Sequence, residues 1–203
     1  MILNNITCYI IHYTKNTDRK KYMEEFILPI LSEYISDFVW ITDYDREDAF
    51  IKQIKSVETS GVLSCSKKHY EAWRLFRQSG ADYCLVLEDD VMFEKDIDVK
   101  KEFSSLLNLI NPDHTIISIG SGCNMHGKAN GLTKEGAGRC GDSYILHKKY
   151  LDIWNDEECY TVAVTAFMNN ILYDKKISWT YYEPTIFCQG SQNGTYCSNI
   201  RDF

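Results

Sequence analysis

The sequence has no long apolar run and no excess of basic residues. No stretch approaches the roughly 18 to 20 apolar residues of a membrane-spanning helix, so we expect no transmembrane segment. The start, Met1 to Asn5, lacks the basic and apolar regions of a signal peptide, which predicts a cytoplasmic protein if the chain is the whole gene product. The net charge of -7 argues against nucleic acid as a partner, because a phosphate backbone requires a basic surface.

The eight cysteines include no Cys-x-x-Cys pair, so a zinc site of the usual spacing is not expected. Cys8 and Cys84 lie inside apolar, strand-like runs, where we expect small buried thiols. A chain of 203 residues with 44% hydrophobic content can bury one sizeable core but is short for two. We therefore predict a single domain over residues 1–203.

Apolar periodicity predicts strands and helices that alternate cleanly over the first two thirds of the chain. The expected strands are 7–13, 38–42, 83–87, 115–119, 143–146, 177–182 and 185–188. The expected helices are 16–34, 63–78, 99–110, 148–154 and 164–173, and Pro29 should kink or divide the first of them. This order predicts an α/β fold with a mainly parallel, partly mixed sheet.

Three consecutive carboxylates, Glu88, Asp89 and Asp90, directly follow the apolar strand at 83–87. Ligands of open α/β sheets bind outside the carboxyl ends of strands. On an extended backbone Glu88 and Asp90 point to one side, and Asp89 points to the other. Asp90, with help from Glu88, is therefore a candidate site for Mn²⁺ or Mg²⁺ bound together with a diphosphate. The alternative is an acidic turn that caps helices or carries surface charge.

Two further features have more than one interpretation. His69 lies on the inward stripe of its helix, and a lone histidine there is more often a hydrogen-bonded core residue than a catalytic one. Residues 120–141 are rich in glycine and are predicted to form a mobile loop that closes over a bound donor. The Gly-x-Gly-x-x-Gly match at 136–141 inside this loop is rejected as a dinucleotide site, because no strand precedes it and no long helix follows.

The order of these motifs resembles glycosyltransferase family 25, the lipooligosaccharide and procollagen galactosyltransferases. In the second motif Gly61, Cys65 and His69 match the family, whereas Lys68 replaces its serine. The family's Pro-Val-Asp before the last long helix is also missing, because this chain has Thr165 at the aspartate position. The resembling segments are CYIIHYTKNTDRKKYM (8–23), GVLSCSKKHYEAWRLF (61–76), LVLEDDVMF (85–93), IISIG (116–120) and EPTIFCQGSQNGTYCSNI (183–200).

The resemblance implies a GT-A fold, a UDP-linked hexose as the donor, inversion at the sugar carbon, and a glycan or glycoprotein acceptor. On this hypothesis a metal held by Asp90 and Glu88 bridges the two donor phosphates. The other candidate residues are Arg19, Lys68 and Asp89 around the phosphates, Thr14 and Asp43 for the nucleoside, and His69, Asp142 and Glu183 for catalysis, the last two as general bases.

Two other functions stay open on the sequence. A metal-dependent phosphoryl-transfer enzyme could use the same acidic triplet. Such an enzyme would need further acidic or histidine ligands at the carboxyl ends of strands. Asp113 and His114 precede a strand instead, which argues against this function. An inactive family member that binds sugar or nucleotide is the other alternative, and Thr165 in place of the family aspartate favours it.

Overall fold

A computed structural model of the chain describes residues 6–122, 130–133, 140–153, 161–174 and 179–198. The described residues form an α/β fold around a seven-stranded sheet in the order β2-β1-β3-β7-β5-β8-β6. Strands β1, β2, β3, β5 and β8 run in one direction, whereas β7 and β6 run in the opposite direction. The predicted mainly parallel, partly mixed sheet is therefore confirmed.

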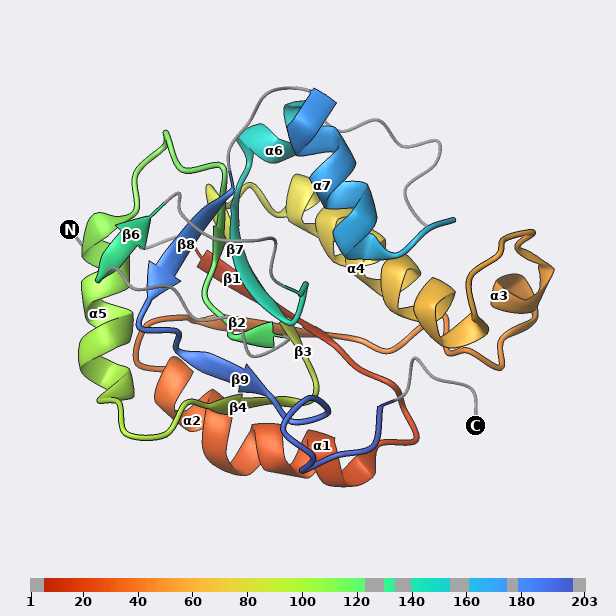
Figure 1. Cartoon of the computed structure of the whole chain (residues 1–203), viewed down its shortest axis with the longest axis horizontal. Helices are drawn as coiled ribbons and strands as arrows, with labels where there is room; N and C mark the ends of the chain where they lie inside the picture. The colour runs from red at the N-terminus through yellow and green to blue at the C-terminus, as the bar shows by residue number, and fades with distance from the viewer. Residues whose placement is uncertain (1–5, 123–129, 134–139, 154–160, 175–178, 199–203) are drawn as a thin grey trace.

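The main sheet contains β1 (Ile6–Ile11), β2 (Asp37–Ile41), β3 (Tyr83–Glu88), β5 (Ile116–Ser118), β6 (Gly131–Thr133), β7 (Ser143–His147) and β8 (Thr180–Glu183). A second, two-stranded antiparallel sheet pairs β4 (Val91–Phe93) with β9 (Phe187–Gln189). Figure 1 shows this small sheet beside α1, below the main sheet. The small sheet joins the residues that follow the acidic triplet to the C-terminal part of the chain.

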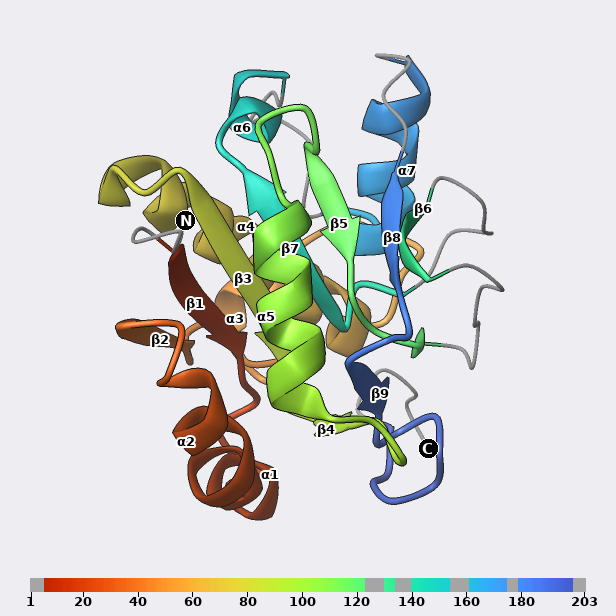
Figure 2. The same cartoon turned by 90° about the vertical axis from the view of Figure 1, so that its left-hand side faces the viewer.

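The helices lie on both faces of the main sheet. Figures 1 and 2 show α4, α6 and α7 on one face, and α1, α2 and α5 on the other. The helical elements are α1 (Thr17–Tyr22), the π-helical η1 (Met23–Ile27), α2 (Leu28–Leu31), α3 (Ala49–Gln53), α4 (Ser60–Ser79), α5 (Val99–Leu109), α6 (Lys149–Ile153) and α7 (Val164–Asp174). None of the helices in the described ranges is long and apolar enough to cross a membrane.

Strand β3 is covered on both faces, as its apolar sequence predicts. Tyr83, Leu85 and Leu87 pack into the core shared with α2 and α5, whereas Cys84 and Val86 pack into the core shared with α4. This alternation is the two-residue period of a strand. Glu88 lies two residues after Val86, so its side chain points toward α4 as well.

The break expected near Pro29 is confirmed, and three short elements differ from the sequence-based expectations. The helix expected at 16–34 is divided, and the break is a π-helical turn just before Pro29. Proline has no amide to donate, so a π turn re-pairs the backbone at this point. Helix α3, strand β4 and strand β6 were not predicted, and β6 interrupts the long loop expected at 120–141. The rest of that loop, 123–129 and 134–139, lies outside the described residues, so its mobility stays a prediction.

The central position of β3 predicts a large difference between two identical substitutions. Leu85 is 0% exposed and Leu109, at the end of α5, is 44% exposed. We expect Leu85→Ala to lower the free energy of unfolding by about 2–5 kcal/mol, because it leaves a cavity between β3 and the helices. Leu109→Ala should cost about 1 kcal/mol or less. Urea denaturation of both variants checks this, and similar losses would contradict the burial of β3.

Candidate active site

The acidic triplet lies at the edge of the main sheet where parallel strands end. The carboxyl ends of β1, β2 and β3 meet there, and the antiparallel β7 begins there. The Glu88 amide donates to the Asp142 carbonyl at 2.8 Å, and the Asp89 amide donates to the Ile11 carbonyl at 3.0 Å. The backbone of the triplet is therefore held by the strands on both sides of β3.

Asp89 is buried, and internal partners surround its carboxylate. Its Oδ2 accepts hydrogen bonds from His12 Nδ1 at 2.7 Å and from the Tyr13 amide at 3.1 Å. Its Oδ1 accepts a hydrogen bond from Arg19 Nη1 at 2.9 Å. Burial opposes ionisation, but the His12 hydrogen bond and the Arg19 charge outweigh it and lower the pKa of Asp89. Asp89 therefore stays ionised and ties α1 to the end of β3.

Arg19 also links α1 to the C-terminal segment. Its Nη2 donates to the Cys197 carbonyl, and its guanidinium lies 5.1 Å from the centre of the Tyr196 ring. The side chain of Arg19 is only 8% exposed, yet it lines the cleft described below. Arg19 thus has a structural partner in Asp89 and can also present positive charge to a ligand.

Asp90 differs from Asp89 because one of its oxygens has no partner. Its Oδ2 accepts from the Ser191 amide at 3.3 Å and lies 3.8 Å from Arg19 Nη1. Its Oδ1 is buried without a hydrogen-bond partner among the described residues. Burial, followed by the negative charge of Glu88, raises the pKa of Asp90 to about 6. A cation beside Asp90 would relieve both effects.

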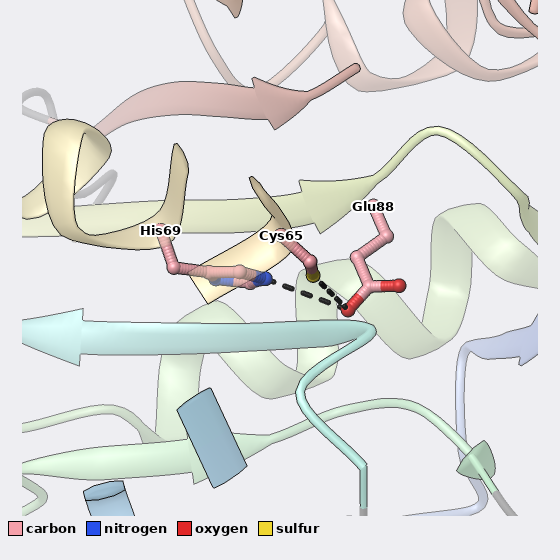
Figure 3. A group of neighbouring side chains, drawn as sticks. All are labelled: Cys65, His69 and Glu88. Atoms are coloured by element: carbon pink, nitrogen blue, oxygen red, sulfur yellow. Dashed lines mark hydrogen bonds and ion pairs between the residues drawn. The ribbon is translucent and has the colours of Figure 1, made fainter. Parts of the chain in front are cut away.

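Glu88 points toward Cys65 and His69 of α4 (Figure 3). Asp89 instead bonds to Arg19 of α1, on the opposite face of the sheet. Glu88 Oε1 lies 3.4 Å from His69 Nε2 and 3.7 Å from Cys65 Sγ. Its Oε2 accepts from Gln189 Nε2 at 3.3 Å, and Gln189 Oε1 is buried without a partner in the described part of the chain. The pleat thus separates Glu88 from Asp89, as the extended backbone predicts.

Lys68 is a buried cation at the ends of β1 and β2. Its Nζ donates to the His12 carbonyl, and it lies 2.5 Å from Asp45 Oδ1 and 3.4 Å from the Thr42 carbonyl. Asp45 also accepts hydrogen bonds from the amide and hydroxyl of Thr14. Lys68 therefore joins the loops after two strands, and its ammonium already has a carboxylate partner.

A cleft of about 550 Å³, open to solvent, lies over these strand ends. Its lining includes three carboxylates and three cations, together with the ring of Tyr13 and the thiol of Cys65. Tyr13 and Arg46 were not predicted, although both lie in loops that follow strands, where ligands of such sheets bind. The charged residues that line the cleft are Glu88, Asp89, Asp90, Arg19, Arg46 and Lys68.

The other predicted site residues do not line this cleft. Thr14 and Asp43 are close in sequence to Tyr13 and Arg46, which line the cleft. Asp43 is exposed, and the Thr14 hydroxyl donates a hydrogen bond to Asp45. His69 and Asp142 are 0% exposed, and Glu183 is 3% exposed on β8. The structure thus brings Arg19, Lys68 and the acidic triplet together, and it buries the candidate bases His69, Asp142 and Glu183 outside the lining of the cleft.

Asp142 is buried against two glycines. A Cβ on Gly120 would lie 2.0 Å from Asp142 Oδ2, and a Cβ on Gly122 would lie 2.2 Å from Asp142 Oδ1. Burial, followed by the negative charge of Glu88, raises the pKa of Asp142 well above its usual range. The glycines therefore make room for a carboxyl group that packs behind the acidic triplet.

No protein-family model and no curated protein sequence matches the chain. Solved structures do match it. One is a glycosyltransferase involved in the glycosylation of the major capsid of PBCV-1, with 15% identity, a TM-score of 0.52, and coverage of 91% of this chain and 92% of that one. Another is a Drosophila β-1,4-galactosyltransferase 7 mutant in complex with manganese, UDP-Gal and xylobiose, with 9% identity, a TM-score of 0.55, and coverage of 98% and 76%.

The fold is GT-A-like. This agrees with the fold expected from the motif resemblance. At such low identity the likeness concerns the fold alone. Membership of glycosyltransferase family 25 therefore stays a hypothesis that rests on the motifs.

The buried Arg19–Asp89 pair predicts a large cost when one partner is removed. We expect Arg19→Met to lower the free energy of unfolding by about 3–5 kcal/mol, because it leaves a buried carboxylate with one charged or polar partner fewer. The control is Lys21→Met on the same helix, whose side chain is 71% exposed. It should change stability by about 0.5 kcal/mol or less. Equal losses in urea denaturation would show that the pair adds no more than a surface charge.

Proposed function

We propose that the chain is a metal-dependent, inverting glycosyltransferase that moves a hexose, such as galactose or glucose, from a UDP-sugar to a glycan or protein-linked acceptor. The observation that carries this proposal is the buried Oδ1 of Asp90, which has no hydrogen-bond partner among the described residues and lies beside Glu88 in a cleft that also contains cations. A carboxylate oxygen without a partner is costly unless something binds it. The cleft lies outside the carboxyl ends of parallel strands, where such sheets bind ligands.

The carboxylates of the cleft fit a hard divalent ion. Asp90 would hold Mn²⁺ or Mg²⁺ mainly through Oδ1, and Glu88 would assist from the neighbouring strand position, since oxygen ligands suit both ions. When bound, the ion would neutralise the negative charge that develops on the leaving diphosphate. Asp89 is held by His12 and Arg19 and therefore orients the site without competing for the ion.

The cations of the cleft fit the donor phosphates. Ion pairs with Asp89 and Asp45 hold the side chains of Arg19 and Lys68 at the cleft wall. Arg46 lies over the Tyr13 ring, with 5.1 Å between its guanidinium and the ring centre, which directs a further cation to the same cleft. Guanidinium groups bind phosphate oxygens in pairs, so Arg46 is a specific candidate for the diphosphate.

The GT-A-like fold and the bound species of one structural neighbour support this assignment. That neighbour, a galactosyltransferase, binds manganese, UDP-Gal and a disaccharide in its crystal. The exposed loop residues Thr14 and Asp43 stay the candidates for the nucleoside. Asp142 and Glu183 stay the candidates for the general base that deprotonates the acceptor hydroxyl, because this chain has Thr165 at the position of the family aspartate, and His69 stays a candidate for contact with the donor.

Removal of one ligand tests the metal site. Asp90→Asn keeps the shape of the side chain but removes its charge, so UDP affinity in the presence of Mn²⁺ should fall at least about tenfold, or 1.4 kcal/mol. The control is Asp113→Asn, an exposed carboxylate near the opposite end of β5. Calorimetric titration of both variants and the unmodified chain measures the change. Unchanged affinity in Asp90→Asn would eliminate the proposed metal site.

The products formed from a UDP-hexose distinguish the candidate activities. A glycosyltransferase breaks the bond between the sugar carbon and the phosphate oxygen, so we expect UDP and either free or transferred hexose. A phosphoryl-transfer enzyme would break the diphosphate and yield UMP and hexose phosphate. Chromatography of a reaction with Mn²⁺ separates these sets. Tight UDP binding without either set of products would instead favour an inactive binding module.

A further inference from the structure

Cys65, His69 and Glu88 form a cluster of three side chains that can bind a metal ion. Glu88 also belongs to the proposed donor-metal site. Cys65 and His69 are four residues apart on α4 and therefore project from the same face of that helix. Both point at Glu88, the last residue of β3 (Figure 3). The three candidate ligand atoms lie within 4.8 Å of one another.

The distances from Glu88 to the other two ligand atoms match those of a tetrahedral site. Zinc binds cysteine sulfur at about 2.3 Å, imidazole nitrogen at about 2.0–2.1 Å and carboxylate oxygen at about 2.0–2.2 Å. At tetrahedral angles these bond lengths place nitrogen and oxygen about 3.4 Å apart, and sulfur and oxygen about 3.6 Å apart. The structure has His69 Nε2 at 3.4 Å and Cys65 Sγ at 3.7 Å from Glu88 Oε1. Two of the three separations thus have the values of a tetrahedral site, and the third, between His69 Nε2 and Cys65 Sγ, lies within 4.8 Å.

The surroundings of His69 provide the support that a ligating imidazole needs. A metal-bound histidine almost always has a hydrogen-bond partner at its other ring nitrogen. Here Nδ1 lies 2.7 Å from the Tyr144 hydroxyl, which also accepts from Trp73 Nε1 at 3.0 Å. The hydroxyl can donate to a bare Nδ1 in the ion-free protein, or accept from a protonated Nδ1 when Nε2 binds an ion. Nε2 is therefore the nitrogen presented to Glu88.

An ion in this cluster would be reachable from solvent and would sit in a negative field. Cys65 and Glu88 both line the cleft, which gives an entry path. Burial, followed by the negative charges of Glu88 and Asp90, raises the pKa of the Cys65 thiol, so the site favours a cation. The thiol loses its proton to solvent as the metal–sulfur bond forms, which leaves the ion bound by a thiolate, a neutral imidazole and a carboxylate.

We propose that Cys65, His69 and Glu88 form a binding site for a thiophilic divalent ion of the zinc class, distinct from the site at Asp90. Sulfur and imidazole favour zinc over Mn²⁺ and Mg²⁺, which prefer oxygen ligands. Since Glu88 belongs to both sites, an ion bound by the thiol withdraws this carboxylate from the donor metal. Zinc is then an inhibitor of the transferase, and this consequence alone rests on the proposed function.

Cobalt is the probe for this site, because Co²⁺ takes up the same tetrahedral geometry and has visible and near-ultraviolet absorption. The full chain, without nucleotide and with a reductant that does not bind metals, is titrated with Co²⁺. We expect a thiolate-to-cobalt charge-transfer band that saturates at one ion per chain, and Zn²⁺ should displace the cobalt because its affinity for such ligands is higher. A titration without that band would overturn the proposal.

Matched cysteine variants show which thiolate produces the charge-transfer band. Cys65→Ser should abolish it, whereas Cys197→Ser, which replaces an exposed thiol, should retain it. Cys65→Ala provides a second variant, and the melting temperature of each shows that it is folded. Tyr144→Phe should weaken cobalt binding about ten- to a hundredfold, because it removes the partner of Nδ1. A band that persists in both folded Cys65 variants would overturn the proposal.

A double comparison separates this site from the proposed transferase site. Asp90→Asn should lose Mn²⁺-dependent UDP binding but keep the cobalt–thiolate band, and loss of the band in this folded variant would overturn the claim of two sites. In the unmodified chain, Zn²⁺ should weaken Mn²⁺-dependent UDP binding over the concentrations at which it displaces cobalt. A chain that shows the band but never binds UDP would retain the ion site and lose the proposed function. UDP binding that Zn²⁺ leaves unchanged would overturn the inhibition.

Discussion

The structure around the sheet edge depends on how three adjacent carboxylates are kept apart at the end of a buried strand. The pleat of β3 sends Glu88 toward α4 and Asp89 toward α1, and the turn that follows leaves Asp90 beside the C-terminal segment. Asp89 alone receives two strong partners, His12 and Arg19, which stabilise its charge. The repulsion that remains falls on the pair Glu88 and Asp90, and a cation is the natural way to relieve it.

That constraint explains why the cleft contains both signs of charge. A diphosphate can approach acidic residues only where cations accompany them, and Arg19, Arg46 and Lys68 lie in the same lining. Each of the three has a position determined by a contact: Arg19 with Asp89, Lys68 with Asp45, and Arg46 with the Tyr13 ring. The cations are therefore preorganised, and ligand binding does not have to order them.

Much of the fold was predictable because long elements have a clear apolar period. Helix α4 and strand β3 were placed within three residues of their observed bounds, as Cys65 to Phe76 form one helical stripe and 83–87 are wholly apolar. Three short elements, β4, β6 and α3, were missed, whereas β5 and β9 were predicted because their residues belong to apolar runs. A three-residue strand has too few residues to show a period, and β4 exists only because β9, about 95 residues later, pairs with it.

The sequence by itself determined the α/β class, the buried strand that carries the acidic triplet and the opposite directions of Glu88 and Asp89, because hydrophobic period and pleat are local properties. Only the tertiary structure decided which aspartate of the triplet has an oxygen without a partner in the described part of the chain. Asp89 and Asp90 are chemically identical neighbours, and the difference between them comes from Arg19 and His12, which lie about 70 residues earlier in the chain. The same holds for Cys65, His69 and Glu88, since a helix and a strand must pack together before two ligands on one and a third on the other face a common point.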